Sequence, residues 1–391
     1  MIKNTDVIQV VIPRTLFGVG AIGQIGDAIK EYGAEKVLVV TDKGLIAAGV
    51  ADEALNAIRD AGLEVDVFDG TGREAPVSVI NELVGLIREG GYGLLVAVGG
   101  GSTMDTTKTA GHLALNEELT VQDLITAKPF KRKLPIIAVP TTAGTGSEWS
   151  AWAVIHNDVA DGIHYPYPTP NNYPDMVILD PALTAKVPPK ITADTGMDAL
   201  AHAIEAYTSP NASVVSDMFA SFTIKMVAKS LRAAYGKGGY NIDDRYNLSI
   251  AASTAMLAMS LTGPGIAHLM NETLGEMAGL AHGRATGLLL PWVMEFNLMT
   301  NPRRFADIAE IMGEKVCGLS DIEAGEKAVA AVRRLMTDLG MPQTLTAVGV
   351  GEDNIPELAK ELVETRGPVI KMAACREMSL EEATALYRRI L

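Results

Sequence analysis

The chain has 391 residues, of which 48% are hydrophobic and 20% charged, so it is a globular chain and not a disordered one. At about 150 residues per domain, this length predicts two or three domains. An excess of 47 acidic over 33 basic residues gives a formal charge of −14, which argues against nucleic-acid and anionic-membrane partners. Two cysteines cannot form a disulfide framework, the first residues lack a signal-peptide pattern, and no apolar run approaches about 18 residues. We therefore expect a cytoplasmic protein without a membrane partner.

Short apolar runs alternate with helical patterns in the first half of the chain. The runs are Val37–Thr41, Leu94–Val98, Ile136–Val139 and Val177–Leu179, and the helical patterns include Ala21–Tyr32, Val50–Ala61 and Pro76–Glu89. Apolar strands separated by helices are typical of a parallel sheet covered on both faces. Ligands bind such sheets at the carboxyl ends of the strands, so functional residues are expected there.

The second half of the chain has a different pattern. No convincing strand is found between Lys190 and Leu391, whereas Ser320–Glu323 and Ser379–Glu382 have the spacing of a capping box at a helix start. We therefore predict two domains that meet at Pro188-Pro189: residues 1–188 form an α/β domain with a parallel sheet, and residues 189–391 form an all-helical domain.

A run of three glycines, Gly99, Gly100 and Gly101, follows a predicted strand and continues into Ser102, with a helix predicted at Thr106–Leu115. Glycines let the backbone approach a ligand closely, and the helix start offers free N–H groups to a phosphate. The alternative is a tight turn without a ligand. The run lacks the spaced glycines of the usual dinucleotide fingerprint, so it indicates phosphate binding without identifying the ligand.

Two further loops end predicted strands. Asp42 could accept hydrogen bonds from both ribose hydroxyls of an adenosine, which would favour NAD over NADP, or it could simply cap the following helix. The loop Pro140–Glu148 carries four hydroxyl side chains and two glycines. It could line the phosphates or the nicotinamide, or be an ordinary polar loop.

The chain has only six histidines, and three of them combine with an aspartate into a plausible ligand set. Asp198 and His202 are four residues apart, which places them on one face of a helix. With His268 and His282 they would make one carboxylate and three imidazoles, a set that suits Fe²⁺ or Zn²⁺. Taken singly, each histidine could equally be a structural residue.

Together these features resemble the iron-containing (group III) alcohol dehydrogenase family over essentially the whole chain. The resemblance rests on Thr-Asp-Lys at 41–43, Gly-Gly-Gly-Ser at 99–102, the loop at 140–148, Leu-Asp-Pro at 179–181, the segment 195–207 and His-Gly-Arg-Ala at 282–285. It implies a Rossmann-like domain and a helical metal-binding domain with the active site in the cleft between them. It also implies hydride transfer between a small alcohol or aldehyde and NAD(H), assisted by a divalent metal as Lewis acid.

The resemblance also implies roles for individual residues. Asp198, His202, His268 and His282 match the metal ligands; the ion is expected to be Fe²⁺, with Zn²⁺ and Mn²⁺ as alternatives. The other matches are to coenzyme contacts: Asp42 to the ribose, the glycine run with Ser102 to the pyrophosphate, Asp105 to a position near the coenzyme, and Thr141, Thr142 and Thr145 to the loop beside the phosphates and nicotinamide. A homodimer or larger assembly is expected.

Two positions depart from the family pattern. Glu272 and His164 stand where many members have a histidine and a lysine, so the proton path is left open between these two residues and the ribose hydroxyls. Arg284 could hold an anionic substrate or pair with a structural carboxylate. A glycerol dehydrogenase or a lyase like dehydroquinate synthase are the alternatives on the same fold. The lyase is disfavoured because Gly263–Gly287 has only one basic side chain besides histidine.

Overall fold

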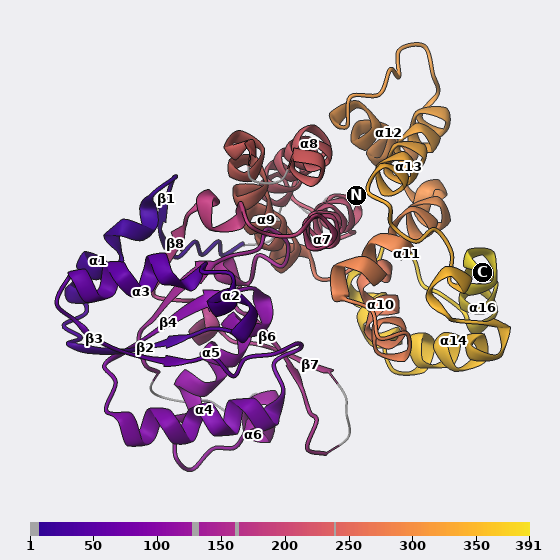
Figure 1. Ribbon diagram of the computed structural model, residues 1–391. Helices are drawn as coiled ribbons and strands as arrows, with labels where there is room; N and C mark the ends of the chain where they lie inside the picture. Colours follow the sequence, from indigo (N-terminus) through magenta and orange to yellow (C-terminus); the bar gives the residue numbers. More distant parts are fainter. Residues whose placement is uncertain (1–7, 127–132, 161–163, 238–239) are drawn as a thin grey trace. The chain divides into compact units, whose positions relative to one another are not determined.

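The computed structural model describes residues 8–126, 133–160, 164–237 and 240–391 (Figure 1). The chain divides into two compact units: Val11–Val187 forms one, and Pro188–Leu391 together with residues 8–10 forms the other. Among the described residues no single helix is long and apolar enough to cross a membrane; the bent pair Ile242–Thr262 and Ile266–Gly275 reaches those limits on length and composition only.

Six parallel strands form the main sheet of the first unit, in the order β1-β8-β5-β4-β2-β3. They are β1 (Arg14–Phe17), β2 (Lys36–Val40), β3 (Glu64–Phe68), β4 (Leu94–Gly99), β5 (Ile136–Pro140) and β8 (Met176–Leu179). From β2 the chain moves outward to β3, whereas from β4 it moves the other way to β5 and β8. The topological switch point therefore lies between β2 and β4, where ligands of such sheets bind.

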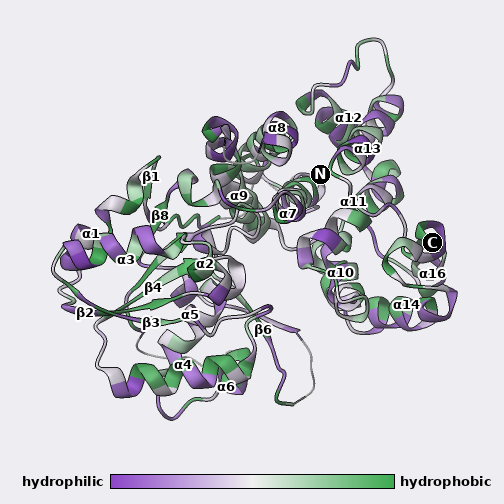
Figure 2. Cartoon of the chain, in the orientation of Figure 1, coloured by the Kyte–Doolittle hydropathy of each residue, from purple (hydrophilic) through white to green (hydrophobic). Residues whose placement is uncertain are grey.

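Helices cover both faces of this sheet because successive side chains of its strands point to opposite sides. Val37 and Val39 pack with one set of helices, and Leu38 and Val40 with the other. The first set is η1 (Ala21–Gln24), α1 (Ile25–Glu31) and α3 (Ala51–Asp60); the second is α4 (Val77–Gly90), α5 (Gly101–Leu113) and α6 (Val121–Ile125). The sets lie on opposite sides of the sheet in Figure 1, and Figure 2 shows its central strands as hydrophobic.

The predicted parallel sheet is confirmed, and all four predicted strands are present. β1 and β3 were not predicted. β3 is an edge strand in which the acidic residues Glu64 and Asp66 alternate with apolar ones. β1, at the other edge, has only four residues. A short antiparallel hairpin, β6 (Trp152–His156) with β7 (His164–Pro168), adds a second small sheet.

The second unit is helical throughout its described residues, as predicted, and the two capping boxes are present at Ser320–Glu323 and Ser379–Glu382. α10, α11, α14 and α16 enclose an apolar core, and α7 packs against α8, α9 and α11. The helices are α7 (Pro189–Thr208), α8 (Val214–Lys237), α9 (Ile242–Thr262), α10 (Ile266–Met277), α11 (His282–Asn297), α12 (Pro302–Ile311), α13 (Asp321–Asp338), α14 (Ile355–Glu364), α15 (Gly367–Ala373) and α16 (Leu380–Ile390).

Candidate functional site

Three helices of the second unit bring one carboxylate and three imidazoles together. α7 carries Asp198 and His202 one turn apart, α10 carries His268 in its first turn, and α11 begins at His282. Asp198 Oδ1 lies 3.6 Å from Nε2 of His268 and 3.6 Å from Nε2 of His282. One ligand atom from each of these three residues falls within 4.8 Å of the others, as a shared metal ion requires.

His202 lies beside this group but does not belong to it, because no ligand atom of its ring lies within 4.8 Å of the ligand atoms of all three other residues. Its Nδ1 is 4.0 Å from Asp198 Oδ2, and its ring stacks on His268 with the centroids 4.4 Å apart. The structure thus brings all four predicted ligands into one cluster. The ligand atoms of three of them lie within 4.8 Å of one another, and His202 lies beside these three.

The donor atoms of the cluster suit a divalent cation. Asp198 Oδ1, His268 Nε2 and His202 Nδ1 are buried and have no hydrogen-bond partner among the described residues. Leaving such atoms unpaired costs free energy unless something else satisfies them. The side chain of His282 is 53% exposed, so one side of the cluster is open to solvent, as an open coordination position requires.

Glu205 fixes the ring of His268 from the side opposite Asp198. One turn beyond His202 on α7, its carboxylate accepts hydrogen bonds from the backbone N–H groups of Gly265 (3.2 Å) and Ala267 (2.6 Å) and contacts His268 Nδ1. Only glycine fits at position 265, because a Cβ there would lie 2.5 Å from the Glu205 carboxyl carbon. The carboxylate therefore directs Nε2 of His268 toward Asp198, as carboxylates behind metal-binding histidines do.

Asn271 contacts the ring nitrogen of His282 that is not directed at Asp198. Its Nδ2 lies 2.9 Å from His282 Nδ1, and it also donates to the His282 carbonyl and to Thr286 Oγ1. Sequence reasoning missed Asn271. Its place one turn after His268 on the same helix is the signal that could have found it.

Replacing Glu205 with glutamine is expected to lower the metal affinity about 10–100-fold while leaving the fold intact, because the amide keeps the side chain's size but holds His268 less firmly. Equilibrium dialysis against Fe²⁺ measures this. Exposed Glu381, changed to glutamine on α16, is the control. An unchanged affinity in the Glu205 variant would show that Glu205 only caps α10.

Charges inside the cluster shift its protonation. Burial by itself raises the pKa of Asp198, but the neighbouring imidazoles of His202, His282 and His268 outweigh it and hold the pKa below its usual range. Burial lowers the pKa of His202 to about 3. For His268, the lowering by burial is outweighed by Glu205 and Asp198, which raise its pKa to about 10. Two buried carboxylates thus give the cluster a cation-attracting field.

In the first unit, the predicted coenzyme residues lie at the switch point of the sheet. Asp42 follows β2, the glycine run ends β4 and opens α5, and Thr141 follows β5. The Thr141 N–H donates to Gly99 O at 3.0 Å, so the ends of β4 and β5 are tied together. The structure therefore places these predicted residues at the carboxyl ends of adjacent central strands, along one edge of the sheet that runs across the strands.

Two of the glycines leave room for the loop Pro140–Glu148, which we call the threonine loop. A Cβ on Gly101 would lie 2.8 Å from the Thr145 side chain, and one on Gly100 would lie 3.2 Å from Thr142 Oγ1. The helix also begins at Gly101, five residues earlier than predicted, so the N–H groups of its first turn belong to the glycine run itself. This edge thus combines a helix N-terminus with closely packed small residues.

Some predicted coenzyme residues also have structural partners. Asp42 Oδ1 accepts from the Leu45 N–H at 3.0 Å, which confirms that it caps the short helix α2 (Lys43–Ala47). Ser102 Oγ donates to the Gly72 carbonyl and accepts from the Ala75 N–H.

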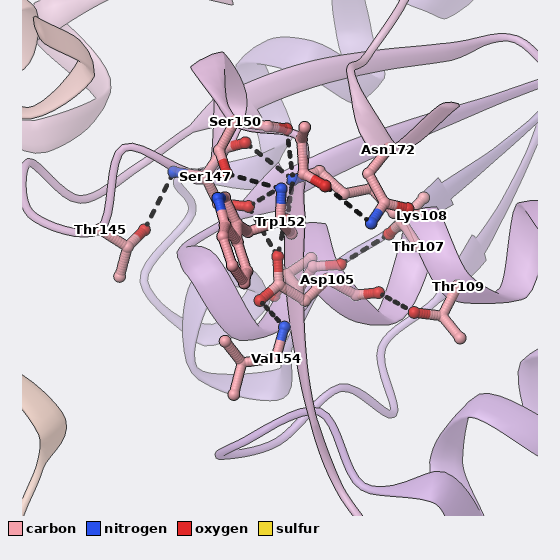
Figure 3. A network of polar contacts seen from close by, with 12 residues as sticks. Asp105, Thr107, Lys108, Thr109, Thr145, Ser147, Ser150, Trp152, Val154 and Asn172 are labelled. Carbon is pink, nitrogen blue, oxygen red and sulfur yellow. Dashed lines mark hydrogen bonds and ion pairs between the residues drawn. The ribbon is translucent and has the colours of Figure 1, made fainter. Parts of the chain in front are cut away.

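Asp105 belongs to a buried polar network beneath this edge (Figure 3). Its carboxylate accepts from Ser147 Oγ (2.6 Å) and from the Val154 N–H (2.9 Å). Lys108, 1% exposed, lies 3.7 Å from Asp105 and donates to the carbonyl and hydroxyl of Ser147 and to the carbonyl of Trp152. Burial raises the pKa of Asp105 and lowers that of Lys108. The pair joins α5 to the threonine loop and to β6; Lys108 was not anticipated from the sequence.

The two residues considered for proton transfer or anion binding in the second unit are in ion pairs. Arg284 lies 2.9 Å from Asp194, as the structural alternative had it, and Glu272 lies 2.8 Å from Arg366.

Two family models match the chain: iron-containing alcohol dehydrogenase over residues 13–181, and the C-terminal part of the Fe-containing alcohol dehydrogenase family over residues 192–391. The chain is 39% identical to the 1,3-propanediol dehydrogenase of Klebsiella pneumoniae over 88% of its length and 89% of the relative's. It is 36% identical to the NAD-dependent methanol dehydrogenase of Bacillus methanolicus, over 90% and 92%. A crystal structure of a 1,3-propanediol oxidoreductase superposes with a TM-score of 0.93 at 35% identity, covering 99% of this chain and 100% of that one.

Proposed function

The chain belongs to the iron-containing alcohol dehydrogenase family, an NAD-dependent class of oxidoreductases, and on that premise we propose that it interconverts a short primary alcohol and its aldehyde. The observation that carries the proposal is the cluster of Asp198, His268 and His282, whose donor atoms point at one another. In this assignment residues 1–188 form the coenzyme domain and residues 189–391 the metal domain.

The cluster would hold Fe²⁺, with His202 as the fourth ligand. A cation bound there supplies Lewis-acid polarisation of the alcohol or aldehyde oxygen. Glu205 and Asn271 keep the two imidazoles of α10 and α11 aimed at Asp198. Because His282 is half exposed, the substrate oxygen would enter from its side.

The edge between β2 and β4 would hold NAD(H). The N–H groups at the start of α5, with Gly100, Gly101 and Ser102, would bind the pyrophosphate, and Asp42 would accept from the adenosine ribose. Thr141, Thr142 and Thr145 would flank the phosphates and nicotinamide. Asp105 would act through Ser147, by fixing the threonine loop.

Short substrates are proposed because the two relatives described above are named for 1,3-propanediol and methanol. NADH oxidation is measured by absorbance on anaerobically purified protein with Fe²⁺, against propanal, 3-hydroxypropanal, lactaldehyde and an anionic aldehyde of similar length. We expect turnover with the neutral aldehydes. Turnover with the anionic aldehyde alone would contradict the proposed substrate class.

Replacing Asp42 with glycine is expected to reduce the preference for NADH over NADPH by about tenfold or more, because the carboxylate that repels a 2′-phosphate is removed. The ratio of kcat/KM for the two coenzymes measures this. Since Asp42 also caps α2, Asp42→Ser is the matched variant that keeps a capping oxygen without the charge. A preference unchanged in both variants would refute the ribose contact.

A further inference from the structure

A second group of metal-binding side chains lies in the first unit, on the β6–β7 hairpin. His156 ends β6 and His164 begins β7, and the two are directly opposed in the antiparallel ladder. Their rings stack with centroids 4.7 Å apart and 13° between the planes. Glu74, from the loop before α4, reaches both: its Oε2 lies 3.4 Å from His164 Nε2 and 4.0 Å from His156 Nδ1.

These distances are compatible with a shared metal ion. Tetrahedral zinc with bonds of about 2.0–2.1 Å holds its ligand atoms about 3.4 Å apart. One pair in this group already has that separation, and all three atoms lie within 4.8 Å. The cluster around Asp198 meets the same 4.8 Å criterion, with its nearest pairs at 3.6 Å. Both groups therefore meet the same distance criterion for a shared ion.

The backbone holds Glu74 in place. Glu74 and Ala75 have φ values of 69° and 47°, which non-glycine residues adopt only when their surroundings impose it. The His156 N–H lies 3.1 Å from the Glu74 carbonyl and 3.2 Å from that of Ala75, and the Ala75 N–H donates to Ser102 Oγ. The backbone at Glu74 and Ala75 is thus fixed against the hairpin and against Ser102 by hydrogen bonds.

A second contact anchors the same end of the hairpin to α4. Asp158, two residues beyond His156, accepts from the backbone N–H of Ser78 at 3.0 Å and from its hydroxyl.

Both imidazoles are mostly covered, with side chains 24% and 16% exposed, whereas Glu74 is 45% exposed. Solvent therefore reaches the group, so water could complete a four-coordinate shell.

We propose that Glu74, His156 and His164 bind a second divalent cation of the zinc class, separate from the cluster around Asp198. Two imidazoles and one carboxylate with an open position are a known zinc ligand set. A cation there would bridge the hairpin and the loop 72–75, and that loop is bonded to Ser102 at the start of α5. The site would thereby stiffen the glycine run from outside it. Its existence is independent of the proposed catalytic activity.

The distribution of the histidines allows the bound metal ions to be counted and assigned to sites. Of the six, three lie in the Asp198 cluster and two in this group, and the sixth, His112, is fully buried with Nε2 at the Asn171 carbonyl. Cys317 is exposed, so the titration is done in a Cys317→Ser background. Metal-free protein is titrated with Zn²⁺ in competition with a chromophoric chelator, and the bound equivalents are counted.

We expect two equivalents in the background protein and in Glu89→Gln, an exposed glutamate of α4 that serves as the matched control. His164→Asn, His156→Gln and Glu74→Gln should each weaken one equivalent by at least about tenfold and leave the other. His268→Ala should lose the other equivalent, and His164→Asn with His268→Ala should lose both. Circular dichroism checks that each variant is folded; with three independent ligand variants, one misfolded protein does not decide the result.

One equivalent in the background protein, removed by His268→Ala, would overturn the proposal and leave an ordinary ion pair between Glu74 and His164. Two equivalents that persist in all three ligand variants would also overturn it, since the second ion would then bind elsewhere.

Discussion

Replacing Asp198 with asparagine is expected to abolish stoichiometric iron binding, with an affinity loss beyond about 100-fold, and to lower NADH turnover about a thousandfold. Asp198 is the carboxylate toward which both His268 and His282 point, so its charge is the centre of the ligand set. Loss of a ligand that contacts the ion should lower the metal affinity more than loss of a residue that only orients a ligand, which lowers it about 10–100-fold. Polarisation of the substrate oxygen is worth several kcal/mol, or about three powers of ten in rate.

Iron content after anaerobic reconstitution and the rate of NADH oxidation are measured on the same preparation. Asp243→Asn, an exposed aspartate near the start of α9, is the control and should keep both. An Asp198→Asn protein that retains one equivalent of iron would contradict the assignment of the ligands.

Replacing Lys108 with methionine is expected to destabilise the protein by about 3–5 kcal/mol, because it leaves the buried carboxylate of Asp105 without its cation. The side chain is 1% exposed and donates to carbonyl groups of the threonine loop and of β6, so those acceptors also lose their donor. Denaturant unfolding followed by circular dichroism measures the change. We expect the loss to be accompanied by weaker NADH binding, since Lys108 holds the loop that carries Thr145.

Two variants separate charge from packing. Lys30→Met, at an exposed position of α1, should change the stability by less than about 0.5 kcal/mol. Combining Lys108→Met with Asp105→Asn should cost less than the sum of the single changes, since the neutral amide no longer needs a cation. Additive effects would mean that the two side chains do not act as a pair.

The sheet was readable from the sequence where its strands are buried on both faces. Val37–Val40 and Leu94–Val98 are continuous apolar runs, and these are what parallel strands with helices on both sides require. β3 was missed because Glu64 and Asp66 interrupt its apolar residues, as the exposed edge of a sheet permits. β1 was missed because four residues give too short a pattern for periodicity to identify.

The metal cluster could be predicted only in part from the sequence. The spacing of Asp198 and His202 predicted a shared helix face, which α7 confirms, but the approach of His268 and His282 depends on how α10 and α11 pack, and local pattern does not encode that. The residue types suggested these two histidines as ligands, and the family resemblance then assigned them. Glu205 could be placed by the same spacing rule, whereas Asn271 and Lys108 act through contacts distant in sequence.

The central claim is that Asp198, His268 and His282 hold the ion on which NAD-linked turnover depends. The most direct measurement is the rate of NADH oxidation with 3-hydroxypropanal as Fe²⁺ is added stepwise to metal-free protein, in the wild type and in His268→Ala. We predict that the wild-type rate rises from near zero and saturates when the Asp198 cluster is filled, and that the variant stays inactive at every iron concentration at which the wild type is saturated. Full activity in the metal-free protein, or a normal response to iron in His268→Ala, would contradict the account.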